Sequence, residues 1–295
     1  MLDLRYLAEL WQKHSVMADV PVREFAIGSR NFSFNSAPEI MGVINLSPDS
    51  WYRESVSLTT ENAVRRARVL SAAGASLVDI GAESSLSQAA RADEALQRSR
   101  LLPVIREATA SGIIVSAETY NPVVARAALE SGARVLNITG IADLPEIFRM
   151  AADFDAAVIL CYVQGANVRE VADFDFGSDT VGLMREYFAR HIETGEQAGL
   201  TKLIVDPGLG FYYRNLGDSS IRIRHQMRTF LETFRLRELG CPICHALPHA
   251  FEYFGEEVRC AEPFFAVLAA LGKTNLFRTH EVARIKAVLD TLHAF

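Results

Sequence analysis

The chain contains two short segments whose residue types and spacing suit the binding of a polar ligand. In Asp206-Pro-Gly-Leu-Gly-Phe211, a carboxylate comes directly before a proline and two glycines, which favour a tight turn. A carboxylate fixed in this way can accept two parallel hydrogen bonds from a planar N–C–N donor edge, such as that of an amino-pyrimidinone ring. The alternative interpretation is that Asp206 only caps a helix or closes a turn.

The second segment is Arg278-Thr-His280, which pairs a guanidinium with an imidazole just before a predicted helix. Cationic side chains and the positive end of a helix dipole together favour an anion. The segment therefore predicts an anion site in which Arg278 and His280 act on the bound group. In the simpler alternative, His280 only caps the helix.

A third segment, Cys241-Pro-Ile-Cys-His245, matches the C-x-x-C-H pattern by which c-type haem is attached. We reject haem because the chain shows no export signal and the segment falls where a strand is predicted. With His249 nearby, a zinc site is one remaining interpretation. A strand that carries two buried thiols is the interpretation we favour.

Apolar runs that end in polar residues recur along the chain. Met41-Gly-Val-Ile-Asn-Leu-Ser-Pro-Asp-Ser50 is the first: its apolar half suits a buried strand, and its polar half suits a ligand site. We predict eight such strands, at Ile40–Leu46, Ser76–Gly81, Ile113–Ala117, Arg134–Ile138, Ala156–Val163, Thr201–Val205, Cys241–Ala246 and Thr274–Phe277. Helical spacing predicts a helix after each strand, at Thr60–Ala73, Arg91–Ala110, Pro122–Ser131, Leu144–Ala152, Thr180–Ala198, Ile221–Leu239, Cys260–Leu271 and His280–Leu292.

Eight strand–helix units predict an α/β fold with a single (β/α)8 TIM barrel over residues 37–295. Residues 1–36 are predicted to form an N-terminal appendage, a short helix and then a β-hairpin of Arg23–Ile27 and Asn31–Phe34. With 295 residues, 49% of them hydrophobic, the chain is long enough for one barrel of this kind. A doubly wound open sheet is the alternative fold.

In such a barrel, ligands bind at the carboxyl ends of the strands. The polar residues predicted there are Asn45 with Ser47 and Asp49, Glu83 with Ser84 and Ser85, Glu118 with Tyr120 and Asn121, Asn137 with Thr139, Tyr162 with Gln164, Asp206, His245, and Arg278 with His280. Trp51 and Tyr52 follow the first strand and would stack on a ligand or cover the barrel mouth. A polar residue can simply begin a loop, but eight such strand ends in a row predict a polar pocket.

The composition argues against several kinds of partner. The formal net charge is −6 and no block of basic residues occurs, so we expect no nucleic-acid partner. No apolar run approaches the ~18 residues of a membrane span, and we expect a cytoplasmic protein. The four cysteines are expected to be free thiols.

The order of these segments resembles the dihydropteroate synthase family. The resemblance rests on Met41–Ser50, Val78-Asp-Ile-Gly-Ala-Glu-Ser-Ser85, Glu118-Thr-Tyr-Asn-Pro122, Asp206–Phe211 and Arg278-Thr-His-Glu-Val, and covers roughly residues 40–290. Members of that family are TIM barrels that use magnesium, join a dihydropterin-methyl diphosphate to p-aminobenzoate and release diphosphate. They commonly form homodimers through their last helices.

The resemblance implies a role for six residues of this chain. Asn45 would help to hold the magnesium–diphosphate group. Asn137 and Asp206 would bind the edge of the pterin, and Glu118 stands where the family usually has a pterin-contacting aspartate. Arg278 and His280 would bind the diphosphate and assist its departure.

Two departures from the family pattern fall on the substrate loops. Leu86 stands where the family has an arginine in the loop that helps to build the aminobenzoate site. Ala250 stands where the family has a lysine that packs against the pterin. We therefore expect a diverged pterin-binding enzyme with an altered acceptor. The alternatives are a non-catalytic pterin-binding or assembly protein, and a pterin-dependent methyl-transfer barrel with a corrinoid partner.

Overall fold

The computed structural model describes residues 2–49, 55–84, 89–211 and 213–295. Leu86, Trp51 and Tyr52 lie outside the described residues. Within the described ranges, no helix is both long enough and apolar enough to cross a membrane. All four cysteines are free thiols, as the sequence predicts.

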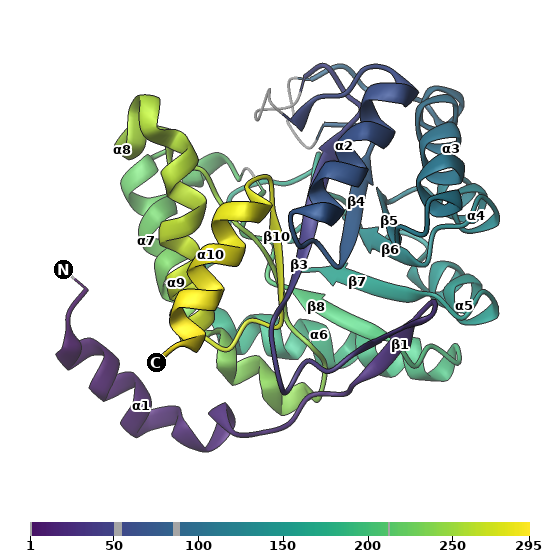
Figure 1. Ribbon diagram of the computed structural model, residues 1–295. Helices are drawn as coiled ribbons and strands as arrows, with labels where there is room; N and C mark the ends of the chain where they lie inside the picture. Colours follow the sequence, from purple (N-terminus) through teal and green to yellow (C-terminus); the bar gives the residue numbers. More distant parts are fainter. Residues whose placement is uncertain (1, 50–54, 85–88, 212) are drawn as a thin grey trace.

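A sheet of eight parallel strands forms the centre of the molecule (Figure 1). Its strands are β3 (Glu39–Asn45), β4 (Leu77–Gly81), β5 (Val115–Thr119), β6 (Val135–Ile138), β7 (Ala157–Cys161), β8 (Leu203–Asp206), β9 (Cys244–Ala246) and β10 (Leu276–Thr279). Around the sheet they follow the order β8-β7-β6-β5-β4-β3-β10-β9. Strands such as β4 and β7 are buried along their whole length, which explains their continuous apolar sequences.

The two outer strands of this order meet and close the barrel. Val205 of β8 forms a parallel bridge with Ile243, just before β9. The amide of Val205 also donates a hydrogen bond of 2.9 Å to the carbonyl of Pro242. The prediction of a (β/α)8 barrel is therefore confirmed, and the open-sheet alternative is wrong.

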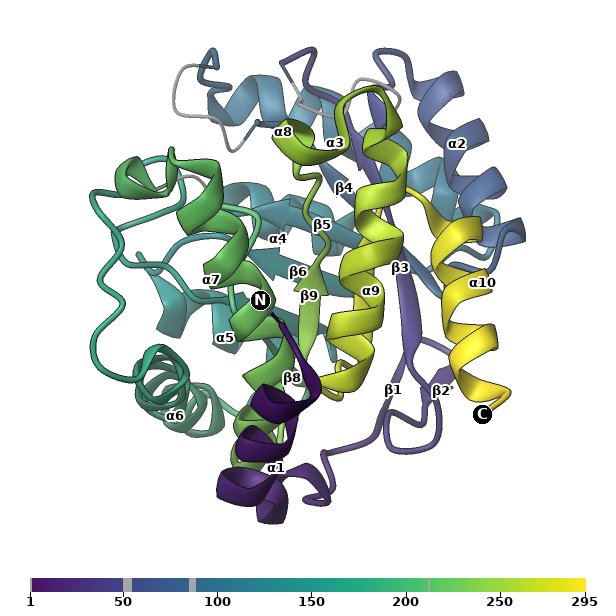
Figure 2. The ribbon, with the colours of Figure 1, turned by 90° about the vertical axis from the view of Figure 1, so that its left-hand side faces the viewer.

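A ring of helices surrounds the barrel, as the two views in Figures 1 and 2 show. The helices that follow the strands are α2 (Thr60–Ala72), α3 (Glu94–Ala110), α4 (Pro122–Glu130), α5 (Leu144–Asp153), α6 (Thr180–Gln197), α7 (Ser219–Glu232), α9 (Ala261–Leu271) and α10 (Val282–His293). A 3₁₀ helix, η3 (Thr233–Leu239), continues α7. The short helix α8 (Phe251–Phe254) lies between β9 and α9 and was not predicted.

The last strand begins two residues later than predicted. Thr274 and Asn275 precede β10, because the Asn275 side chain is tied to two other segments. Its Oδ1 accepts from the amide of Ile243 at 2.9 Å, and its Nδ2 donates to the carbonyl of Phe34 at 2.9 Å. Arg278 consequently lies within β10 rather than in the loop after it, and the strand holds it rigidly.

The N-terminal segment closes the amino end of the barrel. Helix α1 (Leu4–Ala18) begins after Asp3, whose carboxylate accepts from the amide of Tyr6. The hairpin of β1 (Phe25–Ile27) and β2 (Arg30–Phe32) buries Ile27 and Phe32, together with Phe34 just after it, against inward-facing residues near the starts of the barrel strands, such as Met41 and Leu77. The division into parts at residues 1–36 and 37–295 stays a prediction.

Candidate active site

A cavity opens at the carboxyl ends of the barrel strands. It encloses about 910 Å³ of space, including its solvent-filled mouth. Its lining residues are Asn45, Glu83, Ser84, Glu118, Leu209, Gly210, Phe211, Arg222, Gln226, Ala246, Leu247, Pro248, His249, Ala250, Phe251, Arg278 and His280. Four of the six residues that the sequence assigns to the site therefore share one cavity: Asn45, Glu118, Arg278 and His280.

Arg278 is the centre of the polar floor of this cavity. Its Nε donates to Oδ2 of Asp79 at 2.8 Å, and its Nη2 donates to Oε2 of Glu118 at 2.5 Å. The Asp79 side chain is fully buried, whereas those of Arg278 and Glu118 are each 16% exposed. A buried guanidinium between two carboxylates forms charge-assisted bonds that fix its orientation.

Asn137 joins the same network from below. Its Nδ2 donates to Oδ2 of Asp79 at 2.9 Å, and its Oδ1 accepts from the Cys161 thiol at 3.5 Å. Ser116 donates to the other oxygen of Asp79 at 2.6 Å. Asn137 is buried and is not among the residues that line the cavity.

Asp206 also lies below the lining, at the carboxyl end of β8. Its Oδ1 accepts from the amide of Gly208 at 2.8 Å, within the turn that the sequence predicts. Gly208 has φ +73°, and a Cβ at this position would lie 2.4 Å from the carbonyl oxygen of Tyr162. Only glycine fits at this position, and the resulting turn fixes the Asp206 carboxylate.

Burial shifts the pKa of the acidic groups upward. Desolvation raises the pKa of Glu118 to about 7, although attraction to Arg278 opposes the shift. Desolvation also raises the pKa of Asp206 to about 6, against the lowering effect of the Gly208 amide and of Arg278. Desolvation disfavours the charge on Arg278, but Glu118 and Asp79 outweigh it and raise the pKa of this guanidinium. The charge of this network is therefore sensitive to what fills the cavity.

Asn45 lies at the carboxyl end of β3, in the cavity wall. Its Nδ2 donates to the hydroxyl of Ser55 at 2.6 Å, which fixes the orientation of the amide. The carbonyl oxygen Oδ1 is the atom that could bind a cation, and an amide oxygen is a hard donor of the kind that Mg²⁺ prefers. The donor chemistry of Asn45 therefore fits the magnesium that the family resemblance implies.

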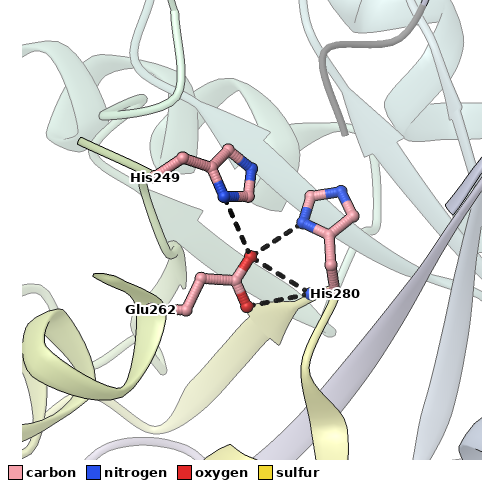
Figure 3. A group of neighbouring side chains, drawn as sticks. All are labelled: His249, Glu262 and His280. Carbon is pink, nitrogen blue, oxygen red and sulfur yellow. Dashed lines mark hydrogen bonds and ion pairs between the residues drawn. The ribbon is translucent and has the colours of Figure 1, made fainter. Parts of the chain in front are cut away.

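His280 lies against a buried acid that the sequence did not single out. Glu262 of α9 accepts from His280 Nδ1 at 2.8 Å and from the backbone amide of His280 at 3.1 Å (Figure 3). It also accepts from the backbone amide of Glu281 at 3.2 Å. Desolvation raises the pKa of Glu262 to about 6. The backbone donors before α10, which the sequence assigned to an anion, therefore bind the carboxylate of Glu262 instead.

His245 does not belong to the cavity, contrary to its place among the predicted strand ends. It is fully buried and points outward from β9 toward the helices. Its Nε2 lies 2.8 Å from the hydroxyl of Thr233, and its ring lies 4.6 Å from that of Phe230. Alternation along the strand sends His245 and its neighbour Ala246 to opposite faces, and Ala246 is the one that lines the cavity.

Sequence reasoning missed the roles of Asp79 and Glu262, and both left a signal. Asp79 interrupts the apolar strand Leu77–Gly81, where an acid is costly unless it is paired. Glu262 is an acid in the otherwise apolar helix Ala261–Leu271, and it is fully buried. An acid inside an apolar element indicates a buried partner, which here is Arg278 in one case and His280 in the other.

Comparison with known proteins identifies relatives of this chain. The profile of the family described as "Pterin binding enzyme" matches residues 41–247. A dihydropteroate synthase of Synechocystis is 27% identical over 281 residues, which cover 90% of this chain and 94% of that protein. A probable bifunctional folylpolyglutamate synthase/dihydropteroate synthase of Haloferax volcanii is 30% identical over 89% of this chain. The chain spans only 31% of that longer relative.

Solved structures give the same picture. Dihydropteroate synthase of Xanthomonas albilineans with 4-aminobenzoic acid has a TM-score of 0.77 and 27% identity, with 92% of this chain and 98% of that chain covered. The same enzyme in complex with 7,8-dihydropteroate has a TM-score of 0.73 and 26% identity, with the same coverage of both chains. The match over residues 41–247 spans all the strands from β3 to β9 and most of the polar floor. The chain belongs to the pterin binding enzyme family.

Proposed function

We propose that this chain is a diverged enzyme of the dihydropteroate synthase type, which transfers a dihydropterin-methyl group from its diphosphate to an amine acceptor in folate metabolism. The observation that carries the proposal is the shared cavity: Asn45, Glu118, Arg278 and His280 line it, and Asp206 lies just beneath. Relatives with the same fold include a dihydropteroate synthase solved with 7,8-dihydropteroate.

The pterin would lie over the floor formed by Glu118 and Asp206. Both carboxyl groups are acceptors when ionised, and a pterin presents a planar N–C–N edge of donors. Phe211 in the cavity wall supplies an aromatic face for the ring. Asn137 acts from below by holding Asp79, which in turn holds Arg278.

The diphosphate would lie between Asn45 and the pair of Arg278 and His280. A magnesium ion held by Asn45 Oδ1 would neutralise charge on the diphosphate. Arg278 and His280 would donate to the oxygen that becomes negative as the C–O bond breaks. The acceptor nitrogen then forms the C–N bond and releases a proton, and diphosphate leaves.

We propose that the acceptor differs from p-aminobenzoate. Ala250, Phe251, Leu247 and Pro248 line the cavity where the family resemblance places a lysine beside the pterin. This wall is apolar, and the loop at Leu86 lacks the family's arginine. A less acidic arylamine, without the carboxylate that an arginine would bind, suits such a wall better.

A non-catalytic pterin-binding protein is the second candidate function. Two carboxylates already bind Arg278, and Glu262 already binds the backbone amides at the start of α10. Both contacts reduce the capacity of the site to bind diphosphate, and they therefore favour a binding protein without activity. Turnover with any arylamine would exclude this candidate.

We further propose a homodimer that pairs through the last helices. Leu271 of α9 is 54% exposed and Leu292 of α10 is 38% exposed, which leaves apolar surface near the C-terminus. Light scattering on the purified chain would measure the mass in solution, and a monomer at micromolar concentration would contradict this part of the proposal.

Calorimetry tests the central proposal. The purified chain is titrated with a pterin and, separately, with diphosphate in the presence of Mg²⁺. We expect saturable 1:1 binding of the pterin, strengthened when Mg²⁺ and diphosphate are present. Lack of pterin binding under both conditions would refute the proposal. Release of diphosphate from dihydropterin-methyl diphosphate across a panel of arylamines then distinguishes the enzyme from the binding protein.

A further inference from the structure

Three side chains from different parts of the chain converge at the edge of the cavity. His249 follows β9, Glu262 belongs to α9, and His280 follows β10 (Figure 3). One potential ligand atom from each residue lies within 4.8 Å of the other two. The three side chains are largely buried, with 12% exposure for each histidine and 1% for Glu262.

The two oxygens of Glu262 have different partners. Oε2 accepts from the hydroxyl of Thr279 and from the amides of His280 and Glu281. Oε1 faces the histidines, with His280 Nδ1 at 2.8 Å and His249 Nδ1 at 3.7 Å. The backbone and Thr279 therefore hold the carboxylate in place, so that Oε1 lies between two imidazoles. Outer partners of this kind orient the carboxylate ligands of metal ions.

Two imidazoles and one carboxylate are a known set of protein ligands for catalytic zinc, in which water occupies the fourth position. A tetrahedral Zn²⁺ with ligands ~2.1 Å away holds them about 3.4 Å apart. The two distances to Oε1, 2.8 and 3.7 Å, lie on either side of that value. Both separations from Oε1 are therefore close to the spacing of two ligands on one ion.

The cluster also borders the space in which a fourth ligand could lie. His249 and His280 both line the cavity, together with Asn45 and Arg278. Glu262, by contrast, is behind them and fully buried. An ion bound to the three residues would thus have protein on one side and the cavity on the other.

We propose that His249, Glu262 and His280 bind one divalent transition-metal ion of the Zn²⁺ class, with an open coordination position that faces the cavity. This site is separate from the magnesium position at Asn45, whose amide oxygen is a hard ligand. It goes beyond the proposed function, because it requires neither a pterin nor turnover. The ion would restore positive charge at the helix start where Glu262 occupies the backbone donors.

Metal binding by the full chain tests the proposal directly. The protein is treated with a chelator, dialysed, and titrated with Zn²⁺ by calorimetry and with Co²⁺ by visible spectroscopy, without any pterin. We expect one ion per chain and the d–d absorption of a four- or five-coordinate Co²⁺ bound by nitrogen and oxygen.

Variants locate the ion. His249→Ala removes a ligand that does not hold the helix start, and we expect it to weaken Zn²⁺ binding by roughly 100-fold. Glu262→Gln should weaken it similarly, provided that circular dichroism shows a folded protein. Two variants serve as controls and should bind Zn²⁺ like the parent chain: His293→Ala at an exposed histidine of α10, and Cys260→Ser at the partly exposed thiol.

Three results would overturn the proposal. The first is the absence of saturable binding of Zn²⁺ or Co²⁺ at micromolar concentration. The second is binding that survives in His249→Ala. The third is a Co²⁺ spectrum with thiolate charge-transfer bands, which would assign the ion to cysteines. Because pterin binding is measured in a separate titration, failure here leaves the proposed function to its own test.

Discussion

Arg278 and Asp79 are 199 positions apart in the sequence, and their side chains meet at 2.8 Å inside the barrel. The same guanidinium binds Glu118 of β5, so one cation links β10, β4 and β5. Removal of this cation leaves two largely buried carboxylates without their partner, and the resulting loss of stability can be measured.

We expect Arg278→Met to lower the free energy of unfolding by about 3–5 kcal/mol, the cost of breaking a buried ion pair on one side. Urea denaturation of the two proteins measures the change. Arg185→Met is the matched control, because Arg185 pairs with Glu238 on the exposed surface, and its effect should stay below about 1 kcal/mol. Equal effects of the two substitutions would contradict this account.

Stability should fall as the pH rises through the range in which Glu118 ionises. Its pKa is raised to about 7 in the folded chain, so the folded state keeps the proton to a higher pH than the unfolded state does. The folded state consequently loses stability between about pH 4.5 and pH 7. Glu118→Gln should remove this contribution, so its melting temperature relative to the parent should rise with pH over that range. A constant difference would show that Glu118 titrates normally.

Pterin affinity should depend on the ionisation of Asp206. The pKa of Asp206 is raised to about 6, and only the ionised carboxylate accepts from both donors of the pterin edge. Below about pH 6 we expect the dissociation constant to increase about tenfold per pH unit, measured by calorimetry from pH 5 to pH 8. Affinity that does not change over this range would exclude Asp206 as the acceptor.

Asp206→Asn should weaken pterin binding about 100-fold or more, because the amide group places a donor against the donors of the ligand. Asp153→Asn makes the same chemical change at an exposed residue and should bind like the parent chain. If Asp206→Asn retains its affinity, the role of Asp206 is confined to the turn.

The turn after β8 can be tested through Gly208. Gly208→Ala combines a positive φ with a contact of 2.4 Å to the carbonyl of Tyr162. Gly240→Ala has a similar φ of +70°, but its Cβ would meet no atom of the described residues within 4 Å, so it isolates the cost of the backbone conformation, about 1 kcal/mol. We expect Gly208→Ala to be clearly more destabilising in urea and to weaken pterin binding as well. Equal destabilisation would mean that the turn can shift away from Tyr162.

The barrel could be predicted because each strand is a local apolar run with a helix-forming segment after it. Pairing of β8 with β9 could not be read from the sequence, since it depends on a single bridge and on the bond from Val205 to Pro242. The start of β10 was also misplaced, because Asn275 is held by Ile243 and by Phe34, which are distant in the sequence.

The cavity lining was predictable where a polar residue lies at or near the carboxyl end of a strand, as Asn45 and Glu118 do. Contacts between residues of elements that are distant in the sequence were not predictable. Glu262 lies 18 residues before His280 in an apolar helix, and only the packing of α9 against α10 brings the two together. His245 was misassigned because the number of residues in a short strand decides which face a side chain takes.

The hairpin that buries Phe32 and Phe34 at the amino end of the barrel has a consequence for the opposite end. With apolar side chains beneath it, the layer of Asp79, Arg278 and Glu118 meets water mainly through the cavity above. A molecule bound in the cavity would exclude water from the ion pairs of Arg278. In a drier surrounding, charges attract more strongly, so occupancy would stiffen three strands at once.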